Sequence, residues 1–191
     1  RFLEEFGIEI HGHVTCIGGV HSSLPNNFEW ETLEETPYHK ENPNGSKIAA
    51  VRCLDGEAAS KMIIEIDAAR EAGDSVGGII EIIATGIPIG LGSHIQWDRK
   101  ITTTLAAAVM SINAVKGVEF GAGFSQADLR GSQVHDVVKP KNEWTTDSHG
   151  NWLRPWPRRT NNSGGLEGGM TTGEPLVVRA IVKPIATIMN G

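Results

Sequence analysis

Glycine-rich loops beside a lysine–proline step are the part of this sequence most suited to chemistry. Residues 158–187 read RRTNNSGGLEGGMTTGEPLVVRAIVKPIAT, so two polar loops precede an apolar run at 175–182. Glycine lets a backbone approach a ligand where a Cβ would clash. A strand that ends in a fixed Lys-Pro step can present an ammonium group and backbone N–H groups to an anion. The pattern therefore allows an anion site at Lys183 and Pro184, while a glycine-rich hairpin without a ligand is the alternative.

Histidine and cysteine side chains could bind a metal ion, but their spacing in this sequence does not favour a metal site. His11 and His13 lie on the polar face of an expected strand, with no third ligand near them in the sequence. We expect them to be surface or partner-contacting side chains, and no metal site is predicted. Cys16 and Cys53 are far apart. We therefore expect two free, buried thiols in a reducing compartment rather than a disulfide.

Length and composition indicate a soluble globular protein of one or two domains. The chain has 191 residues, of which 39% are hydrophobic and 21% are charged. No apolar run approaches the roughly 18 residues of a membrane helix. The sequence opens at Arg1 with no Met, so we expect it to begin inside a longer chain.

Charge is distributed unevenly between the two halves of the sequence. The net charge is −6 overall, with 6 basic against 15 acidic residues in 1–90 and 11 against 8 in 91–191. An acidic chain is a poor nucleic-acid binder. The basic excess lies in the half that holds the glycine loops, which favours a small anionic ligand over a polyanion.

Hydrophobic periodicity predicts alternating strands and helices. The clearest helix, at 56–72, has apolar residues at steps of three and four, with Asp55 as its N-cap and Gly73 as its end. A second helix is expected at 105–115, capped by Asp98 or Thr102. Walker and dinucleotide-binding glycine motifs are absent. The expected strands are 8–17, 77–87, 117–120 and 175–182.

Two long polar stretches with several prolines, 21–47 and 121–157, are predicted to be irregular. The second contains Trp144, Trp152 and Trp156. Three tryptophans in a polar loop indicate packing onto an apolar surface of the same chain or of a neighbouring subunit. Stacking on a nucleic-acid base is the alternative, which the charge balance disfavours.

Several longer blocks follow one another from Gly73 onward, and the segment FGIEI precedes them near the start. The blocks are GDSVGG, GIPIGLG, MSINAVKGVEFGAGF, RGSQVHD, RTNNSGGLEGGMTTGEP and VVRAIVKPIAT. In this order they resemble the chorismate synthase family. The resemblance covers most of the chain after Gly73, which makes it far more specific than a single glycine motif.

The resemblance implies both a fold and an activity. The fold is α+β, with central, mainly antiparallel β-sheets between outer helices and with long irregular loops. Residues 1–191 would form a single domain, as the incomplete central portion of a chorismate-synthase-like domain. The activity is that of a carbon–oxygen lyase of the shikimate pathway, which serves aromatic amino acid biosynthesis. It removes phosphate from 5-enolpyruvylshikimate 3-phosphate by anti-1,4-elimination and requires reduced FMN.

The resemblance also implies a flavin site, a location and an assembly. Reduced flavin is electron-rich, and a cation with N–H donors nearby would tune it and hold its phosphate. The family further implies a cytoplasmic homotetramer associated with NADP, with no nucleic-acid or membrane partner. The implied FMN-binding residues are Asn113, Ala114, Gly168, Lys183, Pro184, Ile185, Ala186 and Thr187.

Other family motifs are missing from this sequence. It lacks the N-terminal G-x-SHG histidine, the second catalytic histidine, the early arginines, the SARET-type flavin segment and the C-terminal RHDP block. No catalytic residue is therefore assigned, and His135 is interpreted as structural. We expect a central fragment that is inactive alone. A catalytically incomplete flavin- or phosphate-binding module, or an interaction domain built on the tryptophan loop, are the alternatives.

Overall fold

The computed structural model describes residues 2–23, 51–146 and 156–186. Most of the irregular stretch expected at 21–47 lies outside these residues, as do positions 147–155 of the second stretch, including Trp152. Thr187 also lies outside them.

The chain divides into two compact units, which we name after the long helix in each. The α1 unit contains helix α1 (Gly56–Glu71) and consists of His11–Glu81, Ile112–Gly117 and Ala180–Gly191. The α2 unit contains helix α2 (Ile101–Met110) and consists of Arg1–Ile10, Ile82–Ser111 and Val118–Arg179.

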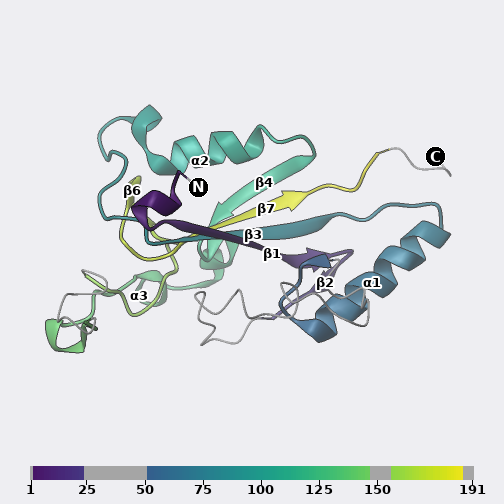
Figure 1. Ribbon diagram of the computed structural model, residues 1–191, viewed down its shortest axis with the longest axis horizontal. Helices are drawn as coiled ribbons and strands as arrows, with labels where there is room; N and C mark the ends of the chain where they lie inside the picture. Colours follow the sequence, from purple (N-terminus) through teal and green to yellow (C-terminus); the bar gives the residue numbers. More distant parts are fainter. Residues whose placement is uncertain (1, 24–50, 147–155, 187–191) are drawn as a thin grey trace. The chain divides into compact units, whose positions relative to one another are not determined.

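The larger sheet has five strands, and neighbouring strands run mainly antiparallel (Figure 1). His13 contacts Glu81, and Thr15 donates to the carbonyl of Ile79, so the first and third strands run in opposite directions. The α+β prediction is therefore confirmed. The order is β2-β1-β3-β7-β4, where the strands are β1 (Glu9–Ile17), β2 (Val20–His21), β3 (Gly78–Thr85), β4 (Val115–Phe120) and β7 (Leu176–Val182).

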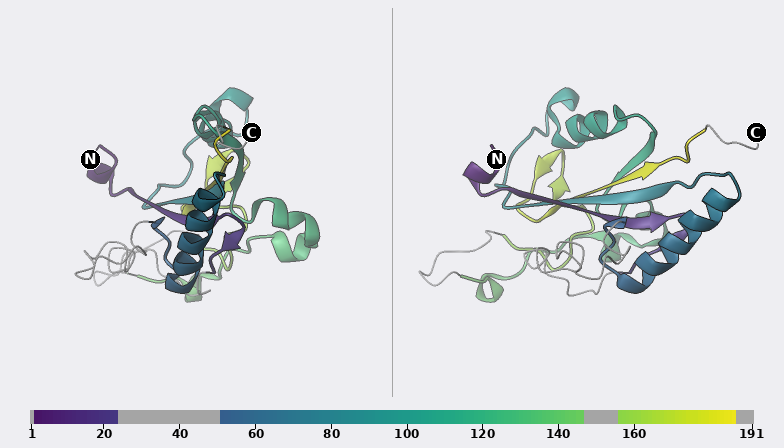
Figure 2. Two further views of the ribbon diagram at one scale, coloured as in Figure 1. Left: turned by 90° about the vertical axis from the view of Figure 1, so that its right-hand side faces the viewer. Right: turned by 45° about the vertical axis from the view of Figure 1, so that its right-hand side comes forward.

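Helix α1 packs beside β1 and β2, as both views in Figure 2 show. The carboxylate of Asp55 accepts hydrogen bonds from the backbone N–H groups of Glu57 and Ala58, both at 3.0 Å, which confirms the predicted N-cap. The apolar face of α1 carries Met62, which is completely buried. The core of this unit is formed by Val51, Cys53, Ala58, Ala59 and Met62, with Val14, Ile17 and Val20 packed against it.

Helix α2 covers the core of its own unit. Ile101, Leu105 and Val109 recur at four-residue steps and pack on buried residues of β3 and β7. The helix begins at Ile101, four residues earlier than predicted, and neither Asp98 nor Thr102 caps it. Instead, the backbone N–H of Ile101 donates to the carbonyl of Gly169 at 2.9 Å. A backbone carbonyl of a distant loop therefore satisfies one of the free N–H groups of the first turn.

The two tryptophans Trp144 and Trp156 pack edge to face, with ring centroids 5.3 Å apart. Cys16 and Cys53 are free and buried, as expected. Within the described residues, no helix is long and apolar enough to cross a membrane. The short elements are the helices η1 (Glu4–Phe6), η4 (Trp97–Arg99), η5 (Gly123–Asp128), α3 (Gly131–Val134) and η6 (Lys141–Glu143), and the hairpin of β5 (Leu166–Glu167) and β6 (Met170–Thr171).

Candidate functional site

The predicted flavin segments at 113–114 and 183–186 lie together in the α1 unit. The backbone N–H of Lys183 donates to the carbonyl of Ala114 at 2.9 Å. This bond joins the residue that follows β7 to the residue that precedes β4. Ala114 has a φ of 71°, a conformation that a non-glycine residue adopts only rarely. The side chains of Asn113 and Lys183 are both exposed, so a ligand could reach them.

A cavity of about 480 Å³ opens beside this junction, entirely within the α1 unit. Lys183, Pro184 and Lys116 of β4 are among the residues that line it. The lining also includes Cys16 and His21, which are paired in register on β1 and β2, with the His21 Nε2 3.7 Å from the Cys16 Sγ. Two lysines and a histidine are among its lining residues and no carboxylate is, so an anion near the lysines would meet no negatively charged side chain of the lining.

Two consecutive glycines at the cavity allow β3 to lie close to its neighbours. A Cβ on Gly77 would lie 2.6 Å from the carbonyl oxygen of Val182, and a Cβ on Gly78 would lie 2.6 Å from that of Cys16. Both distances are shorter than any real carbon–oxygen contact. The GDSVGG block is therefore needed to bring β1, β3 and β7 together at the cavity, whatever ligand the cavity takes.

Gly168 belongs to the α2 unit and lies in the turn between β5 and β6. Its φ of 58° requires glycine or a strained residue. An added Cβ would meet only the Cβ of His94, at 3.9 Å, so the space beside it is open. Of the remaining predicted residues, Ile185 and Ala186 are exposed and follow Pro184 directly, whereas Thr187 is outside the described residues.

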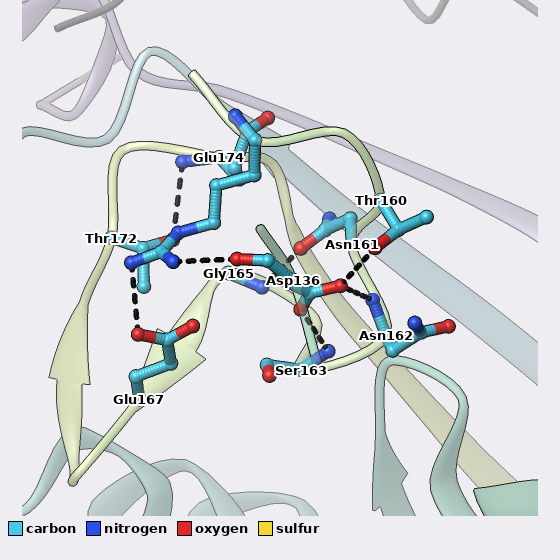
Figure 3. A network of polar contacts seen from close by, with 10 residues as sticks. Asp136, Thr160, Asn161, Asn162, Ser163, Gly165, Glu167, Thr172 and Glu174 are labelled. Atoms are coloured by element: carbon cyan, nitrogen blue, oxygen red, sulfur yellow. Dashed lines mark hydrogen bonds and ion pairs between the residues drawn. The ribbon is translucent and has the colours of Figure 1, made fainter. Parts of the chain in front are cut away.

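Asp136 organises the glycine-rich loop of the α2 unit (Figure 3). Its side chain is fully buried, with 2% of the residue exposed. One carboxylate oxygen accepts hydrogen bonds from the Thr160 hydroxyl at 2.6 Å and from the Asn162 backbone N–H at 2.8 Å, and the other accepts one from the Ser163 backbone N–H at 2.8 Å. Burial acts to raise the pKa of Asp136, but these hydrogen bonds together outweigh burial and hold the pKa below its usual value.

Arg158 links the same loop to the β5–β6 hairpin. Its guanidinium donates to the carbonyl of Asp136 and to a carboxylate oxygen of Glu167, both at 2.8 Å. Its backbone N–H donates to the carboxylate of Glu174 at 2.6 Å. The loop that leads to Gly168 is therefore held by buried or half-buried charged groups, and its shape does not depend on glycine content alone.

This network was not predicted from the sequence. His135, which was interpreted as structural, is exposed, whereas its neighbour Asp136 forms the network. One feature of the sequence could have indicated it. The run TNNS, which begins 24 residues after Asp136, has N–H and hydroxyl groups that need an acceptor when they are buried, and a carboxylate can supply one. A second correction concerns His13, which is 1% exposed rather than on the surface, and whose Nε2 lies 3.0 Å from a carboxylate oxygen of Glu81. Within the described ranges, no group of three His, Cys, Asp or Glu side chains could hold a metal ion.

Comparison with known proteins identifies relatives of the whole chain. The chorismate synthase family model matches residues 1–191. A chorismate synthase of Bacillus cytotoxicus is 49% identical over 188 residues, which are 98% of this chain and 43% of that protein. A chorismate synthase of Listeria monocytogenes serotype 4a is 44% identical over 98% of this chain and 44% of its own length.

A solved structure gives the same result. A crystal structure of chorismate synthase superimposes with a TM-score of 0.71 and 39% identity, and the match covers 97% of this chain and 52% of that one. The chain thus spans less than half the length of the two curated relatives and about half that of the solved chain. The chain belongs to the chorismate synthase family.

Proposed function

We propose that the protein containing this chain is a chorismate synthase. In this proposal it is a lyase that eliminates phosphate from 5-enolpyruvylshikimate 3-phosphate to form chorismate, in the shikimate pathway of aromatic amino acid biosynthesis. The observation that carries the proposal is the family match over residues 1–191, supported by 49% identity to a chorismate synthase. That relative extends well beyond the matched segment, so the activity belongs to the full natural protein.

Reduced FMN is the proposed cofactor, and the α1 unit contains groups that fit it. The bond between Lys183 and Ala114 brings the two proposed flavin segments together, and Lys183 and Lys116 both line one cavity. A phosphate-bearing cofactor matches that charge, because lysine binds phosphate as a point charge. When bound, reduced FMN supplies an electron-rich ring. The proposed FMN-binding residues are Asn113, Ala114, Gly168, Lys183, Pro184, Ile185, Ala186 and Thr187.

The chain's own residues contribute position and charge to this chemistry. Lys183 would hold an anionic group of the cofactor, and its backbone N–H fixes the junction through Ala114. Gly168 leaves open space where a side chain would project. In this proposal, the proton-handling histidines belong to segments outside the present sequence.

We also propose an organisation for the full protein. These 191 residues would be the central portion of one chorismate-synthase-like domain, as the family resemblance implies, and their match spans 43% of a relative's length. The full protein would be a cytoplasmic homotetramer associated with NADP, as the family resemblance implies.

Anaerobic titration of photoreduced FMN into the full natural protein tests the cofactor assignment. We expect saturable binding in the wild type and weaker binding in Lys183→Ala. Lys61→Ala is the matched control, since Lys61 is an exposed lysine of the same unit that lies on α1, away from the cavity. Equal affinities in all three proteins would overturn the role of Lys183, and no binding by the wild type would overturn FMN as the cofactor.

A further inference from the structure

The loop that follows helix α1 contains a hydroxyl group that reaches the backbone beyond β7. The Ser75 Oγ donates a hydrogen bond to the carbonyl of Ile185 at 2.7 Å, across 110 positions of the sequence. Ile185 belongs to the proposed flavin segment at 183–186 and lies two residues after Lys183. Both partners of this bond are in the α1 unit. A side chain of the GDSVGG block therefore bonds directly to the backbone of the proposed flavin segment.

The end of α1 fixes the backbone from which the Ser75 side chain projects. The N–H of Gly73, which has a φ of 69°, donates to the carbonyl of Arg70 at 3.1 Å. The N–H of Asp74 donates to the carbonyl of Ala69 at 2.9 Å. Together these bonds form a Schellman motif, a common end of a helix. The Asp74 carboxylate then accepts a hydrogen bond from the Ser75 N–H at 2.7 Å, so Ser75 is held close to the helix end.

The segment after β7 has a local reason to need a side-chain donor. Pro184 has no backbone N–H, so at that position the segment cannot donate a backbone hydrogen bond to a neighbouring strand. Gly77 lets the GDSVGG block lie close to it, because a Cβ on Gly77 would be 3.0 Å from the Pro184 Cδ and 2.6 Å from the Val182 carbonyl oxygen. At that short range, the Ser75 hydroxyl supplies a hydrogen bond to the segment one residue beyond the proline.

We propose that Ser75 is a positioning residue, whose hydroxyl holds residues 183–186 in the conformation that binds the cofactor. Ser75 acts through the Ile185 carbonyl rather than by contact with the ligand. A segment that is already held in place loses less conformational freedom when a ligand binds, and this raises the affinity. The inference rests on the proposed function for the identity of that ligand, FMN.

The first test is anaerobic titration of photoreduced FMN into the full natural protein and its Ser75→Ala variant. Ser75 and Ile185 line a cavity of about 390 Å³, so water can replace the lost hydroxyl and the effect is moderate. We expect Ser75→Ala to weaken FMN by about threefold to tenfold. Ser75→Thr keeps a hydroxyl group and should restore most of the affinity. Ser60→Ala is the matched control, since the exposed Ser60 hydroxyl donates to the Gly56 carbonyl within α1.

A double-mutant cycle separates positioning from a general defect of the α1 unit. Ser75→Ala should cost less affinity in the Lys183→Ala background than in the wild type, because both changes act on the same segment. Equal losses in the two backgrounds would indicate independent effects and would overturn the inference. A loss of less than threefold for Ser75→Ala in a protein that binds FMN would overturn it as well.

A measurement without FMN keeps this inference distinct from the cofactor assignment. We expect the backbone NMR order parameter of the Ala186 amide, which shares a peptide unit with the Ile185 carbonyl, to be lower in Ser75→Ala than in the wild type or Ser75→Thr. An unchanged order parameter would overturn the positioning role. A lowered order parameter in a protein whose wild type binds no FMN would support that role and would show that the proposed cofactor is wrong.

Discussion

Replacing Asp136 by Asn should loosen the glycine-rich loop of the α2 unit, although the two side chains are nearly the same size. The carboxylate accepts three hydrogen bonds, from Thr160, Asn162 and Ser163. Asn has a single acceptor oxygen, and an NH2 group replaces the other carboxylate oxygen. That NH2 group must face either the Ser163 N–H or the two donors of Thr160 and Asn162. In the better orientation two bonds survive, the charge is lost, and two N–H donors face each other in a buried site.

The magnitude follows from these losses. Losing a hydrogen bond to a charged group costs about 1.5–3 kcal/mol, and leaving a buried donor unsatisfied costs about 1–3 kcal/mol. We expect a total near 3 kcal/mol in the opening free energy of the loop, after some relaxation. That is roughly a 100-fold loss of hydrogen-exchange protection.

Native-state hydrogen exchange at the Asn162 and Ser163 amides measures this change directly. Asp128→Asn is the matched control, because Asp128 is exposed and should give less than about 0.5 kcal/mol. Protection at both amides that is the same in Asp136→Asn as in wild type would refute the argument that this carboxylate holds the loop.

The lowered pKa of Asp136 adds a test with a defined sign. A carboxyl whose pKa is lower in the folded than in the unfolded state contributes stability above its unfolded pKa, about 3.9. That contribution is lost as the pH falls through the folded pKa, which lies below this value. Loop protection in the wild type should therefore decline with acidification below about pH 4, and Asp136→Asn should lack this part of the decline.

Three further predictions concern the rest of the chain. Lys183→Ala should weaken FMN binding by about 1.5–3 kcal/mol in anaerobic titrations, the size of a lost charged hydrogen bond, and an unchanged dissociation constant would contradict the assignment. Met62→Ala should destabilise the α1 unit by about 2–5 kcal/mol, because a completely buried side chain leaves a cavity; urea denaturation measures this, with the exposed Ile64→Ala as its control. The 191-residue chain alone should not form chorismate, since acid–base groups contribute about 10²–10⁴-fold each and the resemblance places them elsewhere; chorismate formed at the rate of the full protein would disprove this.

Local features were predictable from the sequence because local physics determines them. The helix α1 and its Asp55 cap depend on residues within a few positions of one another. The start of α2 was not predictable in this way, because the backbone N–H of Ile101 donates to the carbonyl of Gly169, 68 residues later.

The polar groups of the interior were predicted least well. His13 follows the polar face of its strand, yet β3 places Glu81 opposite it and allows its burial. Asp136 accepts hydrogen bonds from residues 24 to 27 positions later in the chain, which no local pattern of the sequence indicates. The proposed flavin segments were named from family resemblance, whereas the cavity that Lys116 and Lys183 line could be found only from the sheet.

Turnover of 5-enolpyruvylshikimate 3-phosphate by the full natural protein tests the central claim most directly. Under anaerobic conditions with reduced FMN, we expect chorismate and inorganic phosphate to appear in equal amounts. Omitting FMN, or supplying it only in oxidised form, should abolish both. No chorismate from a folded, FMN-saturated protein would contradict the account.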